Sequence, residues 1–159
     1  MLTEKELQHY GIDATRKANL LKLAEYLRKL NSEQFSMSSF YQQYDEHQDS
    51  WLVTAGPSQI EQATEPNHCG TIACAVGCGP AAGIPAIETD LGWVSYSCRV
   101  FVPSNPAWEF LFSVSWARFD NSPAGAAKRI QFLLKNGLKG IWPANLGMFS
   151  FFETYGLPY

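Results

Sequence analysis

The stretch Asn67–Pro80 reads NHCGTIACAVGCGP and holds three of the four cysteines and one of the three histidines. It contains no Asp, Glu, Lys or Arg and consists largely of small residues. We predict a helix over residues 71–78 that ends at Gly79 and Pro80, because glycine commonly terminates a helix and proline cannot continue one. Such a helix fits two roles: a reactive thiol at its start, or a small face packed into the core.

Two of these cysteines have a spacing that favours packing. Cys74 and Cys78 are four residues apart and share one face of the predicted helix. Free cysteine is among the most buried residue types and behaves as a small hydrophobic residue. Together with Ala73 and Gly77, these cysteines form a small face that lets another element approach closely. We therefore expect a packing role for at least two of the three cysteines in the stretch.

Cys69 is the candidate nucleophile, because it precedes the predicted helix and a helix N-terminus stabilises a thiolate. A nucleophilic cysteine also needs a base that a third group orients. The histidines are His9, His47 and His68, and none follows Cys69, which excludes a papain-like order of cysteine and then histidine. A cysteine-dependent hydrolase or transferase that uses Cys69 with His47 or His68 is therefore the alternative function.

The chain holds enough thiols and imidazoles for zinc, but their spacing does not favour a zinc site. The cysteines at 69, 74 and 78 follow C-x4-C-x3-C, whereas structural zinc sites favour C-x2–4-C pairs on tight turns. A pair of cysteines four residues apart on a helix more often packs than ligates. We predict neither a metal site nor a cofactor.

Length and composition predict a single folded domain over residues 1–159. Hydrophobic residues make up 46% of the chain and charged residues 17%, which is typical of a folded protein. The aromatic content of 14% is high, so some rings should line a surface or an interface. We expect the aromatic tail at 141–159 to dock on the body or on a neighbouring subunit, and we predict a homo-oligomer.

The charge and hydropathy of the chain exclude several classes of partner. The formal net charge of −3 argues against non-specific nucleic-acid binding, because no strong positive field displaces counterions. The first residues have no apolar signal core, and no apolar segment has the length that spans a bilayer. We therefore expect a cytoplasmic protein with no nucleic-acid or membrane partner, whose cysteines are reduced thiols.

Capping residues and the spacing of apolar residues predict a mainly α fold with a short irregular β segment. Thr3 and Glu6 have capping-box spacing, and Ser122, Pro123 and Gly137 mark the two ends of the clearest helix. Residues 93–102 fit a strand or an irregular aromatic segment, since they are rich in valine and aromatic residues. Helices are expected over residues 4–10, 14–31, 38–47, 71–78, 108–116 and 123–136.

Anion recognition is the remaining chemistry that the residues indicate. Gly70 and Thr71 would present backbone N–H groups and a hydroxyl at the start of the predicted helix, which favours a phosphate or a carboxylate. Aromatic rings stack on bases. The candidate ligand-binding residues are Gly70 and Thr71, the cations Arg99, Lys128 and Arg129, and the rings Trp93 and Tyr96, with Trp108 and Trp116 as further rings. The structural alternatives are a core position for each ring, an ordinary cap at Thr71 and a solvated helix face at 128–129.

Three segments of the chain carry a resemblance to known proteins: residues 67–77, FLFS at 110–113 with Trp116, and AAKRI at 126–130. Over residues 15–35 and 65–137 the chain resembles a group of small, mostly uncharacterised proteins of bacteria and their phages, marked by a CGT-x-A-C-A-x-G segment. Members often continue this segment with Gly-Trp, whereas Cys78 follows Gly77 here. Small phage proteins of this type are often counter-defence factors, and some sequester the cyclic nucleotide signals of CBASS or Thoeris immunity without cleaving them.

We therefore expect a non-enzymatic protein that binds a small anionic ligand. The resemblance implies sequestration of a cyclic nucleotide immune signal by a phage protein in the bacterial cytoplasm. Aromatic residues for bases, helix starts for phosphates and the lack of a complete catalytic set agree with this function. A protein-interaction module with the tail at 141–159 as its contact surface is a further alternative.

Overall fold

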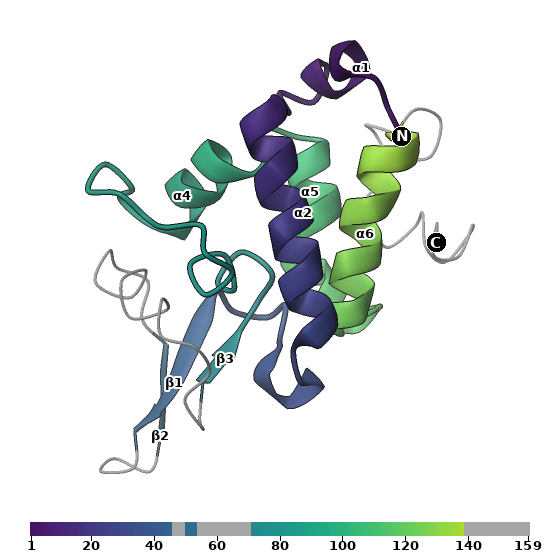
Figure 1. Ribbon diagram of the computed structural model, residues 1–159. Helices are drawn as coiled ribbons and strands as arrows, with labels where there is room; N and C mark the ends of the chain where they lie inside the picture. Colours follow the sequence, from purple (N-terminus) through teal and green to yellow (C-terminus); the bar gives the residue numbers. More distant parts are fainter. Residues whose placement is uncertain (46–49, 54–70, 139–159) are drawn as a thin grey trace.

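The computed structural model describes residues 1–45, 50–53 and 71–138, with only the backbone described at 41–45, 50–53 and 71 (Figure 1). The described chain is mainly helical, as predicted. Its helices are α1 (Glu4–Gln8), α2 (Ala14–Lys29), the 3-10 helix η1 (Ser32–Gln34), α4 (Trp93–Val100), α5 (Ala107–Phe112), the 3-10 helix η2 (Val114–Arg118) and α6 (Pro123–Asn136). Its strands are β1 (Tyr41–Asp45), β2 (Ser50–Val53) and β3 (Thr71–Ala73).

Helices α2 and α6 lie side by side at the centre of the fold, and α5 packs against α6 (Figure 1). Asp13 caps α2 by accepting a hydrogen bond from the N–H of Arg16 at 2.8 Å. Ser122 caps α6 by accepting from the N–H of Gly125 at 2.9 Å, and Gly137 ends that helix with a φ of 68°. The two helices bury Leu20, Leu23, Ala24, Leu27, Ala126, Ile130, Leu133 and Leu134. Both predicted helices are confirmed.

The N-terminal residues connect α1 to the C-terminal end of α6. Thr3 and Glu6 form the predicted capping box, in which the Thr3 N–H donates to Oε2 of Glu6 at 2.9 Å. The N–H of Leu2 donates to the carbonyl of Leu134 at 3.0 Å. The N–H of Leu138 donates to the hydroxyl of Tyr10 at 2.8 Å. These bonds explain why a helix of one turn and a half is held in place.

Residues 93–100 form helix α4, which corrects the strand or irregular segment predicted at 93–102. The Ser95 hydroxyl closes the first turn, accepting from the Gly92 N–H at 3.1 Å and donating to the Gly92 carbonyl at 2.8 Å. The buried residues are Trp93, Tyr96, Ser97 and Val100. This is helical spacing, and burial of one helical face outweighs the β propensity of valine and aromatic residues.

The helix predicted at 108–116 is present with a break at Ser113. Helix α5 ends at Phe112, and Ser113 adopts an extended ψ of 136° before η2 begins. The hydroxyl of Ser113 accepts from the N–H of Ser115 at 3.2 Å and so caps η2. Trp116 is fully buried, and its indole N–H donates to the carbonyl of Phe110 at 2.7 Å.

The strands form a three-stranded antiparallel sheet with the order β2-β1-β3, beside the helices (Figure 1). In its register Tyr44 pairs with Trp51, and Tyr41 pairs with Ala73. This sheet corrects two expectations. Residues 41–45 form a strand where a helix over 38–47 was predicted, and residues 71–73 form a strand where a helix over 71–78 was predicted.

The small residues after β3 form a tight turn that approaches another segment closely. Residues 75–83 are turns, and the N–H of Cys78 donates to the carbonyl of Cys74 at 3.0 Å. Gly77 lies so near the carbonyl of Phe40 that a Cβ at this position would overlap the carbonyl oxygen. Cys74 and Cys78 are both buried. The predicted close approach and the packing role of two cysteines are therefore confirmed, although no helix forms.

Two expectations rest on residues outside the described ranges. One is the docking of the tail at 141–159, and the other is the role of Cys69 and Gly70 as candidate site residues. Within the described ranges, no helix combines the length and the apolar character that crossing a membrane requires.

Candidate functional site

A pocket of about 420 Å³ opens between α5 and the segment that leads into β1. Met37 to Phe40 line one side, and residues of α5 with Ser113 and Val114 line the other. Cys74, which follows β3, also contributes to the lining. This volume falls within the range of small-molecule sites.

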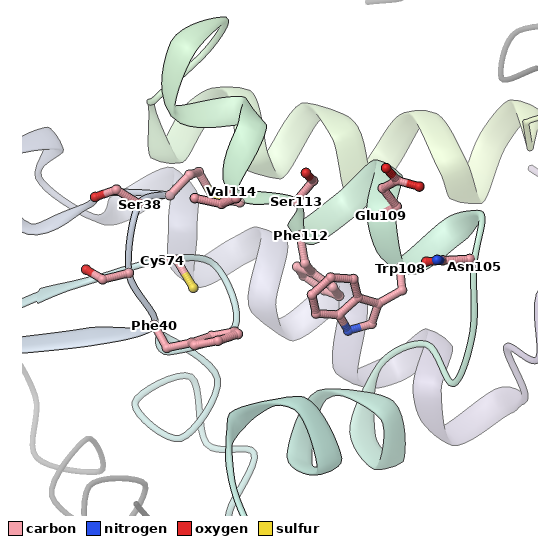
Figure 2. A pocket seen from close by; sticks show the side chains of 11 residues that line it. Ser38, Phe40, Cys74, Asn105, Trp108, Glu109, Phe112, Ser113 and Val114 are labelled. Carbon is pink, nitrogen blue, oxygen red and sulfur yellow. The ribbon is translucent and has the colours of Figure 1, made fainter. Parts of the chain in front are cut away.

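Two adjacent rings form the α5 wall of the pocket, and both are held in place (Figure 2). The indole N–H of Trp108 donates to the hydroxyl of Ser97 at 2.8 Å, and Ser97 donates in turn to the carbonyl of Val94 at 2.9 Å. The ring of Trp108 meets the ring of Phe112 edge-on, with 6.0 Å between centroids. Trp108 therefore presents a fixed and partly exposed face to the pocket.

Phe40 forms the facing wall (Figure 2). Its ring stacks on Trp93 with 6.2 Å between centroids and an interplanar angle of 11°. Its carbonyl accepts from the N–H of Cys74 at 3.2 Å, and Gly77 lies against the same carbonyl. The tight turn after β3 thus sets the position of this wall, which links the end of the CGT-x-A-C-A-x-G segment to the pocket.

The polar groups of the pocket are hydroxyls, an amide and a carboxylate. Glu109 and Ser113 lie one helical turn apart at its α5 side, and Figure 2 shows the Glu109 carboxylate next to Ser113. The Oγ of Ser39 is buried and has no hydrogen-bond partner in the described part of the chain. Among the described lining residues there is no lysine or arginine. The lining therefore offers hydrogen-bonding groups and a negative charge to a ligand.

Cys74 is the thiol of this pocket, and its environment makes it unreactive. Burial raises the pKa of Cys74 to about 11. The neighbouring Cys78 is also buried, and burial raises its pKa well above the ordinary value of a thiol. Because the thiolate is the nucleophilic form, both cysteines are protonated at neutral pH and serve as packing groups.

The two rings predicted to stack on a ligand are core residues. Trp93 is 2% exposed and Tyr96 is 0% exposed. Tyr96 donates its hydroxyl proton to the carbonyl of Ile84 at 2.6 Å, and its ring contacts Trp93 and Phe101 edge-on. Their expected position on the surface is therefore wrong, because both rings fill the space between α4 and the turn after β3. Trp93 instead stacks on the ring of Phe40.

The predicted phosphate ligands lie apart in different environments. Arg129 of α6 is fully buried above the Trp116 ring, so its expected place on a solvated or ligand-facing surface is corrected. Lys128 is exposed on the same helix. Thr71 begins strand β3, so it does not start a helix and presents no helix N-terminus to an anion. Gly70 lies outside the described ranges.

Arg99 forms a bidentate ion pair that fixes a loop. Its Nε and Nη2 donate to the two carboxylate oxygens of Asp90 at 2.8 and 2.5 Å, and Nη2 also donates to the carbonyl of Pro85 at 3.1 Å. Asp90 is buried and accepts a further bond from the N–H of Ile87 at 2.9 Å. The guanidinium therefore holds residues 85–90 on α4, and its charge is neutralised within the fold.

This ion pair predicts a measurable dependence of stability on acid. The hydrogen bonds from Arg99 hold the pKa of Asp90 below its ordinary value. A lowered pKa gives stability that is present above the ordinary carboxyl pKa and is lost as the pH falls through the lowered one. We expect Asp90→Ala to lower the free energy of unfolding by about 2 kcal/mol near neutral pH and by less in acid, once the pH has fallen through the lowered pKa of Asp90. Urea unfolding of both proteins at several pH values measures this difference, and a constant difference would contradict the prediction.

Sequence reasoning missed Glu109 and preferred Trp93 to Trp108. Glu109 is the sole charged residue of the stretch 107–117, AWEFLFSVSWA. A lone carboxylate within an otherwise apolar stretch is the signal that could have drawn attention to this side chain. No local signal in the sequence favours Trp108 over Trp93, because only the packing of α4 decides which tryptophan is buried.

Comparisons of the chain with protein-family models, with curated proteins and with solved structures found no match. The resemblance to small phage proteins therefore stays a prediction.

Proposed function

We propose that this protein binds a small ligand with a planar ring and does not transform it, and that the ligand is a cyclic nucleotide immune signal sequestered by a phage protein. The observation that carries the proposal is the pair of facing walls in the pocket, Phe40 on one side and Trp108 with Phe112 on the other. Aromatic rings that are fixed before binding stack on a base at low entropic cost.

The chemistry of the pocket determines which part of a nucleotide fits inside it. The walls suit a base, whereas Glu109 repels a phosphate and the described lining offers no cation to offset that repulsion. The proposal therefore puts the base in the pocket and the phosphates outside it.

The enzyme alternative has less support from the described residues. Cys74 lines the pocket, but its raised pKa leaves it protonated at neutral pH. A hydrolase or transferase would therefore depend on Cys69, which lies outside the described ranges. A binding function requires only groups that the pocket already presents.

Binding of cyclic nucleotides to Trp108→Ala and Trp108→Phe tests the proposal. Stacking on an aromatic ring contributes about 1–3 kcal/mol per base, so Trp108→Ala should weaken binding about 5-fold to 150-fold in calorimetry. Trp108→Phe loses the same hydrogen bond to Ser97 but keeps an aromatic ring. It is the matched control, and we expect it to retain most of the affinity.

Recovery of the ligand decides between sequestration and catalysis. After incubation the protein is denatured, and the released nucleotide is identified by mass spectrometry. The proposal expects the intact cyclic nucleotide in an amount equal to the bound fraction. A cleaved product, or no binding of any cyclic nucleotide by the wild-type protein, would overturn it.

A further inference from the structure

Glu109 is the charged side chain among the described lining residues of the pocket. It lies in the first turn of α5, is partly exposed and lines the pocket beside Trp108. Among the described residues its carboxylate has no hydrogen bond or ion pair, in contrast to Asp90 and Asp120, whose carboxylates accept bonds from other side chains. Its charge suits the first turn of a helix, and both of its oxygens stay free of bonds to other described residues.

The carboxylate of the pocket lies on its α5 side, and two serine hydroxyls belong to the segment on its other side. A carboxylate accepts hydrogen bonds through two oxygens, and a serine hydroxyl donates one proton. Figure 2 shows Glu109 across the pocket from Ser38 and Phe40. Ser39, between those two residues in the chain, has the buried Oγ that lacks a partner among the described residues. A ring held between the aromatic walls would lie between the α5 side of the pocket, which carries Glu109, and the side that carries Ser38 and Ser39.

We infer that Glu109 determines the specificity of the pocket for a ring with two adjacent N–H donors, of which guanine is the nucleobase example. Guanine presents N1–H and the N2 amino group side by side, which matches the two carboxylate oxygens as a bidentate pair. Its O6 and N7 are acceptors that a serine hydroxyl of the lining can satisfy. This inference rests on the proposed function and names the class of base for the same pocket.

Other bases satisfy this pocket less well. Adenine presents its amino group beside the N1 acceptor, so one carboxylate oxygen faces a lone pair and repels it. Inosine keeps N1–H but lacks the amino group, and it offers one donor where guanosine offers two. The chemistry therefore ranks the nucleosides guanosine, inosine and adenosine in that order of affinity.

Calorimetric titration with these three nucleosides tests the inference without a phosphate in the probe. A hydrogen bond to a charged group contributes about 1.5–3 kcal/mol, so wild-type protein should bind guanosine at least about 10-fold more tightly than adenosine. Glu109→Gln replaces one acceptor oxygen with a donor and should weaken guanosine binding about 10-fold or more, with adenosine affinity unchanged or improved. Glu33→Gln, in the exposed η1, is the matched control and should change neither.

The outcomes separate this inference from the proposed function. Equal affinity for the three nucleosides, or the same guanosine affinity in Glu109→Gln and wild type, overturns the role of Glu109 and leaves cyclic nucleotide binding standing. Binding of an adenine or pyrimidine cyclic nucleotide without measurable guanosine binding does the same. Circular dichroism of Glu109→Gln shows that a loss is not due to unfolding, and Glu109→Asp, which keeps the charge, should retain the preference for guanosine.

Discussion

Arg129→Ala should lower the free energy of unfolding by about 3–5 kcal/mol, the loss expected when a buried, paired charge is removed and a cavity is left. The Arg129 side chain is 0% exposed, and its guanidinium carbon lies 4.1 Å from the centroid of the Trp116 ring. Its Nη1 donates to the carbonyl of Asp120 at 3.3 Å and lies 3.9 Å from the carboxylate of that residue. The substitution removes the cation–π contact and the bond to the turn that precedes α6.

Lys128→Ala is the matched control, because Lys128 is the neighbouring cation and is exposed on the same helix. This substitution should change the free energy of unfolding by no more than about 0.5 kcal/mol. Arg129→Lys should also destabilise the protein, since an ammonium lacks the flat face with which a guanidinium stacks on Trp116. Urea unfolding followed by circular dichroism measures all three. Equal stability of Arg129→Ala and Lys128→Ala would contradict the buried position and would return Arg129 to the candidate ligand residues.

The elements that sequence predicts well are those whose signals are local hydrogen bonds. Thr3 with Glu6, Asp13, and Ser122 with Pro123 each cap a helix within three or four residues. Such bonds need no distant partner, so their residues can be recognised in the chain alone. The same reasoning explains why the start of α6 and its end at Gly137 agree with the prediction to the residue.

The stretch 71–78 was predicted wrongly because its structure depends on residues far away in the chain. Alanine and cysteine fit a helix or a strand, and the decision comes from pairing with β1, in which Tyr41 lies opposite Ala73. Once this pairing forms, a single bond from Cys78 to Cys74 remains of the expected helix. Pairing between strands that are distant in sequence leaves no local pattern to recognise.

The candidate site was predicted only in part, and the reason is similar. The described chain has a pocket with aromatic walls, and one of these walls contains Trp108, which was among the candidate rings. The cations differ, because Arg99 is paired with Asp90 and Arg129 lies on Trp116 inside the fold. Nothing local distinguishes an arginine that faces solvent from one that meets a carboxylate across a loop.

Gly77→Ala should lower the free energy of unfolding by about 2–3 kcal/mol, which is in the upper part of the range for overpacking. The added Cβ would overlap the carbonyl oxygen of Phe40 and would lie 3.1 Å from the Cβ of Ala73. A backbone carbonyl cannot rotate away as the end of a side chain can, so the two segments must separate. Separation would also weaken the bond from the N–H of Cys74 to the same carbonyl.

Gly83→Ala distinguishes this overlap from a general cost of losing glycine. Gly83 has a φ of 78° and nothing within 4 Å of an added Cβ, so its substitution should cost only the strain of a left-handed residue, about 1 kcal/mol. Because Phe40 forms one wall of the pocket, Gly77→Ala should also weaken nucleotide binding, whereas Gly83→Ala should not. Thermal unfolding and calorimetry of both variants measure the two effects. If Gly77→Ala were as stable as Gly83→Ala and bound nucleotide normally, the small residues after β3 would not set the position of the pocket wall.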